Sequence, residues 1–75
     1  MAKSAIIYSS NQCAQCKMTK RLLDMRNIPY NEFNVDDDPK YHDEVKKLSG
    51  QLRVPVTVID ERVVVGYNPT ALLAN

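Results

Sequence analysis

The sequence has no long hydrophobic run, no excess of charge of one sign and no third cysteine. No stretch approaches the about 20 apolar residues of a transmembrane helix. The first apolar run, Ala5 to Tyr8, is only four residues long, which is too short for the core of a secretory signal. Ten basic and nine acidic side chains leave a net charge of +1 and no electrostatic footprint for DNA or RNA. We therefore expect a soluble, cytoplasmic protein that binds neither membranes nor nucleic acid.

The length of the chain limits how it can be organised. Its 75 residues, 44% of them hydrophobic, suffice for one small domain and are too few for two. No repeat, linker or low-complexity segment interrupts them, so we expect a single domain over residues 1–75. Because no long apolar patch is evident, we expect a monomer.

The two cysteines, Cys13 and Cys16, stand three positions apart, soon after the apolar run that ends at Tyr8. If a strand leads into a turn and a helix there, the first thiol lies among the unpaired N–H groups of the helix start, where a thiolate is stabilised. Residues at i and i+3 on a helix have Cβ atoms about 5–6 Å apart, so a modest adjustment closes a disulfide. Because cytoplasmic disulfides are rarely structural, this spacing favours a reversible redox dithiol.

The positions of the two thiols suggest different roles. Cys13 precedes the helix and is expected to be the exposed nucleophile, whereas Cys16 lies in the first turn and should resolve the mixed disulfide. Lys17, four residues after Cys13, is close enough to contribute to the site. A metal or iron–sulfur site remains the alternative, although tetrahedral zinc takes four ligands. The only histidine, His42, is expected to point to solvent.

Periodicity and turn residues predict seven elements. In chain order they are a strand from Lys3 to Tyr8, a helix from Ala14 to Arg26, a strand from Tyr30 to Val35, a helix from Pro39 that closes at Gly50, strands from Val56 to Ile59 and from Arg62 to Val65, and a helix from Thr70 to Asn75. The first strand is apolar on both faces and should be central, with the second parallel to it.

The turn and helix signals add detail to these elements. Asp60-Glu61 predicts a hairpin between the last two strands. In the first helix, the apolar stripe expected to face the core consists of Met18, Leu22, Leu23 and Met25. In the second it consists of Tyr41, Val45 and Leu48.

The order β-α-β-α-β-β-α, with a dithiol at the first strand-to-helix turn, predicts an α/β protein with the minimal thioredoxin (glutaredoxin-like) fold and a four-stranded mixed sheet. The sequence resembles the glutaredoxin-like proteins, most closely the NrdH-redoxins. The segments that carry the resemblance are the Cys-Ala-Gln-Cys box at 13–16, Lys20-Arg21, Asn34-Val35-Asp36, Val54-Pro55-Val56 and Gly66-Tyr67-Asn68-Pro69.

The resemblance implies further site residues. In related redoxins the proline equivalent to Pro55 is cis and faces the dithiol, and the residue before it, here Val54, offers backbone groups to an extended substrate. The segment that holds Gly66 and Tyr67 lies beside the dithiol in these families and is expected to take part in recognition. The resemblance implies a thiol–disulfide oxidoreductase that needs no metal or organic cofactor beyond the disulfide between Cys13 and Cys16.

The resemblance also bears on the redox partners. Glutathione-binding glutaredoxins carry a basic residue before a Cys-Pro-Tyr-Cys box and a Gly-Gly pair followed by an acidic residue; this sequence has none of these. That favours reduction by a thioredoxin reductase-type flavoprotein and electron delivery to protein disulfides, with ribonucleotide reductase as the target implied by NrdH-redoxins. A glutathione-dependent glutaredoxin remains the alternative. Asn68-Pro69-Thr70 departs from the NrdH pattern, in which basic and acidic residues surround the proline.

Overall fold

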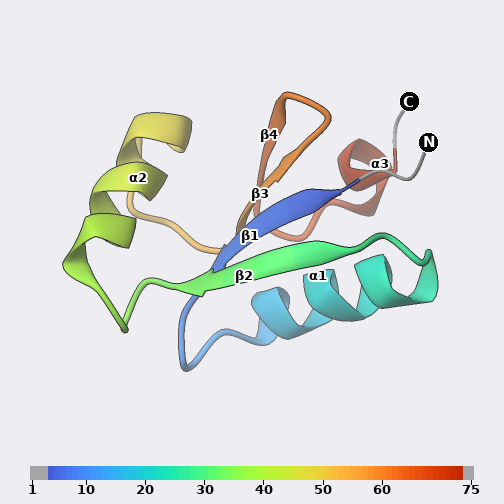
Figure 1. Ribbon diagram of the computed structural model, residues 1–75, viewed down its shortest axis with the longest axis horizontal. Helices are drawn as coiled ribbons and strands as arrows, with labels where there is room; N and C mark the ends of the chain where they lie inside the picture. The colour runs from blue at the N-terminus through green and yellow to red at the C-terminus, as the bar shows by residue number, and fades with distance from the viewer. Residues whose placement is uncertain (1–3, 74–75) are drawn as a thin grey trace.

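The computed structural model describes residues 4–73, and these form a four-stranded mixed sheet flanked by three helices (Figure 1). In chain order the elements are β1 (Ala5–Ser9), α1 (Ala14–Met25), β2 (Tyr30–Asn34), α2 (Pro39–Ser49), β3 (Val56–Ile59), β4 (Arg62–Val65) and α3 (Pro69–Leu72). The predicted order and the glutaredoxin-like fold are confirmed. Within the described part of the chain, no helix is long and apolar enough to cross a membrane.

The sheet has the order β2-β1-β3-β4, which places β1 in its interior. β1 pairs in parallel with β2, and β3 pairs antiparallel with β4, as the right-handed crossover and the hairpin predicted. β1 also pairs antiparallel with β3. Asp60 and Glu61 form the hairpin turn with positive φ angles of 50° and 65°, the conformation of a two-residue type I′ turn. The central position of β1 explains why its side chains are buried on both faces.

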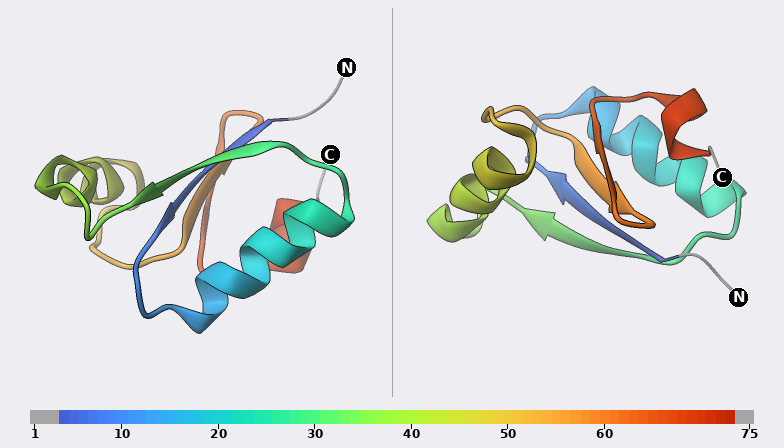
Figure 2. Two further views of the ribbon diagram at one scale, coloured as in Figure 1. Left: turned by 60° about the horizontal axis from the view of Figure 1, so that its bottom comes forward. Right: turned by 90° about the horizontal axis from the view of Figure 1, so that it is seen from above.

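Helices cover both faces of the sheet (Figure 2). On one face, Leu23 of α1 and Leu72 of α3 pack against Ala5, Ile59 and Val64. On the other face, Val45 of α2 packs in a second cluster. The other buried members of that cluster are Tyr8, Val35 and Val56. The end of β1 leads directly into the loop that carries the first cysteine, so the sheet positions the site.

The buried face of α1 differs from the predicted stripe. Cys16, Thr19 and Leu23 are buried, whereas Met18 is 47% and Met25 73% exposed. Leu22 is half-buried beside the core. The prediction was wrong because it counted only apolar residues: Thr19 is inward, and its hydroxyl donates to the carbonyl of Gln15 at 2.9 Å. A buried hydroxyl that is hydrogen-bonded in this way costs little.

The second helix agrees better with its sequence signals. The Asp38 carboxylate caps it by accepting from the Lys40 N–H at 3.0 Å, and Gly50 ends it in the left-handed region at φ +79°. Val45 is buried as predicted, whereas the prediction for Leu48 was wrong, because Leu48 is 38% exposed and packs in neither buried cluster. His42 is exposed, as expected.

Smaller differences occur at the ends of three other elements. β1 includes Ser9, and Lys3 lies outside the described residues. β2 ends at Asn34, although the Val35 N–H still donates to the Ser9 carbonyl at 2.8 Å. α3 begins at Pro69 and ends at Leu72, and residues 74–75 of its predicted range lie outside the described part.

The corrected face of α1 leads to a stability prediction. Leu23→Ala should lower the free energy of unfolding by about 2–5 kcal/mol, because it opens a cavity in the core. Met25→Ala on the same helix should change it by less than about 0.5 kcal/mol, because Met25 is largely in water. Urea unfolding of the two oxidised variants measures both values. Equal losses would contradict the observed orientation of the helix.

Candidate active site

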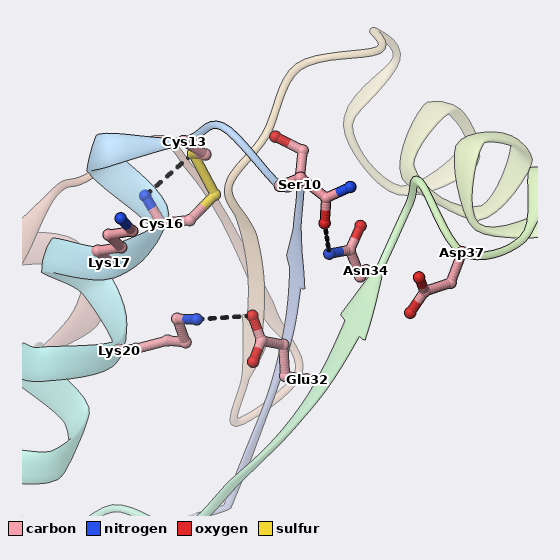
Figure 3. Close-up of a pocket in the computed structure, with 9 residues that line it drawn as sticks. Ser10, Cys13, Cys16, Lys17, Lys20, Glu32, Asn34 and Asp37 are labelled. Atoms are coloured by element: carbon pink, nitrogen blue, oxygen red, sulfur yellow. Dashed lines mark hydrogen bonds and ion pairs between the residues drawn. A yellow bond between two sulfur atoms is a disulfide. The ribbon is translucent and has the colours of Figure 1, made fainter.

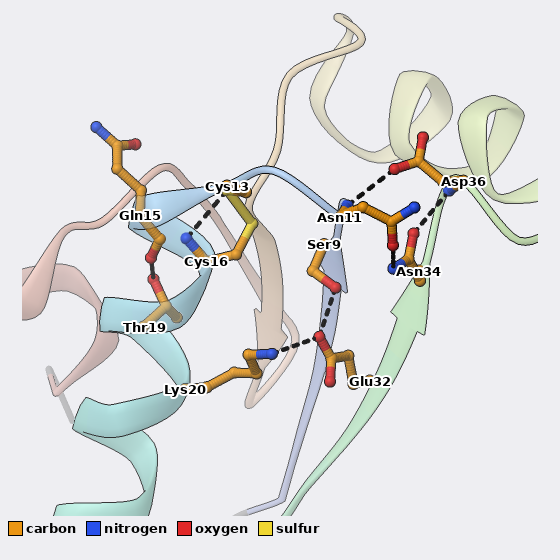
Figure 4. Close-up of polar contacts among 10 residues, drawn as sticks. All are labelled: Ser9, Asn11, Cys13, Gln15, Cys16, Thr19, Lys20, Glu32, Asn34 and Asp36. Carbon is orange, nitrogen blue, oxygen red and sulfur yellow. Dashed lines mark hydrogen bonds and ion pairs between the residues drawn. A yellow bond between two sulfur atoms is a disulfide. The ribbon is translucent and has the colours of Figure 1, made fainter.

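The dithiol lies where β1 delivers the chain to α1. Cys13 is the N-cap of α1, in extended conformation at φ −145°, and its Sγ accepts a hydrogen bond from the Cys16 N–H at 3.0 Å (Figure 4). Serine, threonine, aspartate or asparagine usually supplies the acceptor at this position. Here a sulfur replaces that oxygen, so the group at the positive end of the helix is the reactive one.

The two sulfurs differ in exposure as the sequence predicted. They are joined in a disulfide with a Cα–Cα distance of 5.2 Å. Cys13 is partly exposed, whereas Cys16 is 1% exposed beneath the first turn of α1. An incoming disulfide therefore reaches Cys13 first. This geometry suits Cys13 as the nucleophile and Cys16 as the resolving thiol.

A polar pocket of about 400 Å³ opens beside the disulfide, on the side of β2 (Figure 3). Its lining includes both cysteines, Lys17 and Lys20 from α1, and Glu32 and Asn34 from β2. Lys17 is exposed one turn after Cys13, where the sequence placed it. Charged groups from α1 and β2 can therefore contact a molecule that binds at the sulfurs.

An ion pair connects the elements around this pocket. The Lys20 Nζ lies 2.8 Å from the Glu32 Oε2, and the hydroxyl of buried Ser9 donates to the same oxygen at 2.5 Å (Figure 4). The hydrogen bond from Lys20, followed by the one from Ser9, lowers the pKa of Glu32 against the opposing effect of desolvation. Glu32 is therefore a carboxylate throughout the neutral range.

The loop that carries Cys13 is fastened to the end of β2. The Asn11 N–H donates to the Asp36 carboxylate at 2.8 Å, and the Asn34 amide donates to the Asn11 side-chain oxygen at 2.7 Å. The Asp36 N–H completes this network by donating to the Asn34 side chain at 2.8 Å. These contacts fix the path of the chain into the helix start, and so the position of the sulfur.

The other flank of the dithiol is formed by the segments before β3 and after β4. The peptide between Val54 and Pro55 is cis, which confirms that prediction. The Gly66 N–H donates to the Pro55 carbonyl at 2.8 Å. Gly66 has φ +78°, and a Cβ there would lie 3.7 Å from the Gln15 side chain, between the two cysteines. The structure thus places Gly66 next to Gln15 of the Cys-x-x-Cys turn and connects Pro55 to Gly66 by a hydrogen bond. Val54 and Tyr67, their neighbours in the sequence, are half-buried.

Several residues of this site were not identified from the sequence. They are Ser9, Asn11, Glu32 and Asp36. The alternation of residues 30–35 already separated Glu32 from Phe33 and Val35, which places it on the face that α1 covers. That face was a usable signal for the pair with Lys20.

The candidate metal ligands do not converge. His42 is exposed on α2, which covers the face of the sheet opposite α1 and its cysteines. Among residues 4–73, no group of three or more His, Cys, Asp or Glu side chains is placed to hold a metal ion.

Comparisons with known proteins agree with this geometry. Residues 5–64 match the glutaredoxin family model. A glutaredoxin-like 8.6 kDa protein in the rubredoxin operon of Clostridium pasteurianum is 45% identical over 62 residues, 83% of each chain. The glutaredoxin-like protein NrdH of Lactococcus lactis is 36% identical over 88% of this chain and 90% of its own. The solved structure of the Escherichia coli NrdH-redoxin superposes with a TM-score of 0.83 at 26% identity, covering 92% of this chain and 90% of that one.

The Glu32 interactions lead to a prediction about pH. Because the pKa of Glu32 is lower in the folded protein than in the unfolded chain, its contribution to stability is present above the ordinary glutamate range, about pH 4.3. That contribution disappears as the pH falls through the lowered, folded-state pKa. Thermal unfolding of the wild type and Glu32→Gln should thus show the largest Tm difference at neutral pH and convergence in acid. A Tm difference independent of pH would contradict the assignment.

Proposed function

The chain belongs to the glutaredoxin family and is a thiol–disulfide oxidoreductase, and from this premise we propose that it is an NrdH-type electron donor. In this role it reduces disulfides of partner proteins, ribonucleotide reductase among them, and is itself recharged by a thioredoxin reductase-type flavoprotein. The observation that carries the proposal is the Cys13 sulfur at the helix start, hydrogen-bonded to the Cys16 N–H. The two sulfurs work without a metal or an organic cofactor.

The exchange proceeds in two steps. The Cys13 thiolate attacks one sulfur of the substrate disulfide, forms a mixed disulfide and releases the other substrate sulfur as a thiolate. The Cys16 thiolate then attacks the Cys13 sulfur, releases the second substrate sulfur and leaves the Cys13–Cys16 disulfide. The flavoprotein returns two electrons to that disulfide. The helix start stabilises the thiolate in the first step and the same sulfur as leaving group in its own reduction.

The residues around the dithiol support a flavoprotein reductant over glutathione. Glutathione carries two carboxylates, and its capture relies on charge-assisted contacts. Before the dithiol stand the neutral residues Ser10, Asn11 and Gln12, and the Asn11 side chain is hydrogen-bonded to Asn34. After Gly66, the Asn68 side chain is occupied in capping α3. In addition, the related Escherichia coli NrdH-redoxin is glutaredoxin-like with a thioredoxin-like activity profile.

The flank around Pro55 is the docking edge for the protein substrate in this proposal. Val54 precedes β3 and offers its backbone groups to an extended segment of the partner, in the manner of strand addition. Gly66 has no side chain to obstruct that approach, and Tyr67 adds an aromatic surface next to it. Lys17 faces the incoming substrate from the opposite, β2 side of the dithiol.

Two serine variants test the assignment of the sulfurs. Cys13→Ser should reduce a protein disulfide only at the background rate, because the attacking atom is gone. Cys16→Ser keeps the attacking atom but cannot resolve, so a mixed disulfide with the substrate should accumulate on non-reducing gels. Each variant serves as the matched control for the other. Turnover by Cys13→Ser would disprove the assignment of Cys13 as the nucleophile. A mixed disulfide trapped on Cys16 of that variant would reverse the two roles.

The source of electrons is tested by two coupled assays that follow NADPH oxidation. One contains thioredoxin reductase, the other glutathione with glutathione reductase. Since a hydrogen bond to a charged group contributes about 1.5–3 kcal/mol, each missing anchor should slow the glutathione assay by about tenfold or more. Equal or faster reduction by glutathione would favour the glutathione-dependent glutaredoxin instead.

With ribonucleotide reductase added to the first assay, formation of deoxyribonucleotide should require this protein.

A further inference from the structure

The ion pair between Lys20 and Glu32 lines the same pocket as the dithiol. Lys20 follows Cys16 by four residues, one turn of α1, and both line the same pocket as Cys13 (Figure 3). Glu32 reaches this pocket from β2 and holds the Lys20 Nζ at 2.8 Å. The ammonium group is therefore fixed near the sulfurs and neutralised there by a carboxylate.

We propose that Glu32 is a positioning residue that keeps the Cys13–Cys16 couple reducing, because it neutralises and restrains Lys20 beside the two sulfurs. The proposal concerns the redox couple itself. It therefore does not depend on which protein reduces the disulfide or which protein accepts the electrons.

The two redox states of the dithiol differ in charge. Reduction adds two electrons and two protons to the disulfide and gives two thiols, of which Cys13 then releases its proton to become a thiolate. The disulfide has no charge, so a nearby charge changes mainly the free energy of the reduced state. An unneutralised ammonium stabilises the thiolate, makes reduction more favourable and yields a weaker reductant.

The charged groups that line the pocket are Lys17 and Lys20 from α1, Glu32 from β2 and Asp37 after it. Lys17 is exposed, where water screens its charge. The side chains of Lys20 and Glu32 are only 28% and 34% exposed, so water screens their charges less. A net charge left by one of them alone therefore acts more strongly on the sulfurs. Removing one member of this pair should therefore change the field at the dithiol more than removing a surface charge.

The hydrogen bonds of Glu32 allow its charge to be removed without changing the geometry of the site. Its Oε2 accepts from both Ser9 and Lys20, and Ser9 is 1% exposed. Glutamine presents a neutral oxygen at the same distance along the side chain, so Glu32→Gln can keep both hydrogen bonds. The lowered pKa of Glu32 keeps the native side chain charged at the pH of the measurement.

The experiment compares Glu32→Gln, Lys20→Gln and the double variant in glutathione redox buffers. The equilibrium measured is protein dithiol plus oxidised glutathione against protein disulfide plus two reduced glutathione molecules, with the free thiols counted by alkylation. Glutathione is only the reference couple here. Glu44→Gln is the matched control, since it removes the same charge from α2, on the other face of the sheet. Thermal unfolding of the oxidised forms checks that every variant is folded.

Glu32→Gln should shift this equilibrium toward the dithiol by about three- to tenfold, the scale of one charge change at a half-buried site. A tenfold shift corresponds to about 30 mV toward a more oxidising potential. The pKa of Cys13, from the pH dependence of its alkylation, should fall. Lys20→Gln should move both quantities in the opposite direction, and the double variant should return them toward the wild type.

Three results would overturn the proposal. The first is no shift in Glu32→Gln beyond that of Glu44→Gln. The second is a shift of the same sign in both single variants, which would indicate a merely structural role. The third is a double variant whose shift exceeds that of each single variant.

Discussion

The hydrogen bond from the Cys16 N–H to the Cys13 sulfur is the interaction on which the rest of the site depends. It makes the reactive atom the cap of α1, so the helix cannot begin without placing that sulfur at its positive end. It also fixes the phase of the helix. With Cys16 beneath the first turn, Thr19 and Leu23 follow on the buried side, and Leu23 joins the core under the sheet. Reactivity and packing are therefore set by the same few residues.

The strand order gives the dithiol two unlike flanks. Because β1 lies between β2 and β3, the turn after β1 meets polar side chains from one neighbour and the Pro55 and Gly66 segments from the other. The first flank has charges that act on the sulfurs through space. The second has backbone groups and a glycine, Gly66, which suit close approach of another chain. Electrostatic control and recognition of a partner can therefore change independently of each other.

Most of the fold could be predicted because its signals are local. Asp38 with Gly50 marks the ends of α2, and Asp60-Glu61 joins two short β-branched strands, so each boundary depends on a few adjacent residues. The cysteine pair was predicted from its spacing, whereas the cis peptide before Pro55 was predicted from the resemblance to related redoxins. The face of α1 was not, because a hydroxyl bonded to its own helix is buried at little cost while two methionines remain in water. Hydrophobicity alone does not show which of these side chains is buried and which is exposed.

The charged network was missed for a different reason: alternation placed Glu32 on the face that α1 covers, but its partners are distant in the sequence. Lys20 and Glu32 are 12 residues apart, and Ser9 and Glu32 are 23 apart. They meet because the parallel register places Ile7 opposite Glu32, which puts Ser9 and Glu32 on the same face of neighbouring strands, under α1. The Cys-x-x-Cys box contains none of these residues. Two chains with the same box can therefore differ in reducing power, because the charges that act on the thiolate come from residues elsewhere in the sequence.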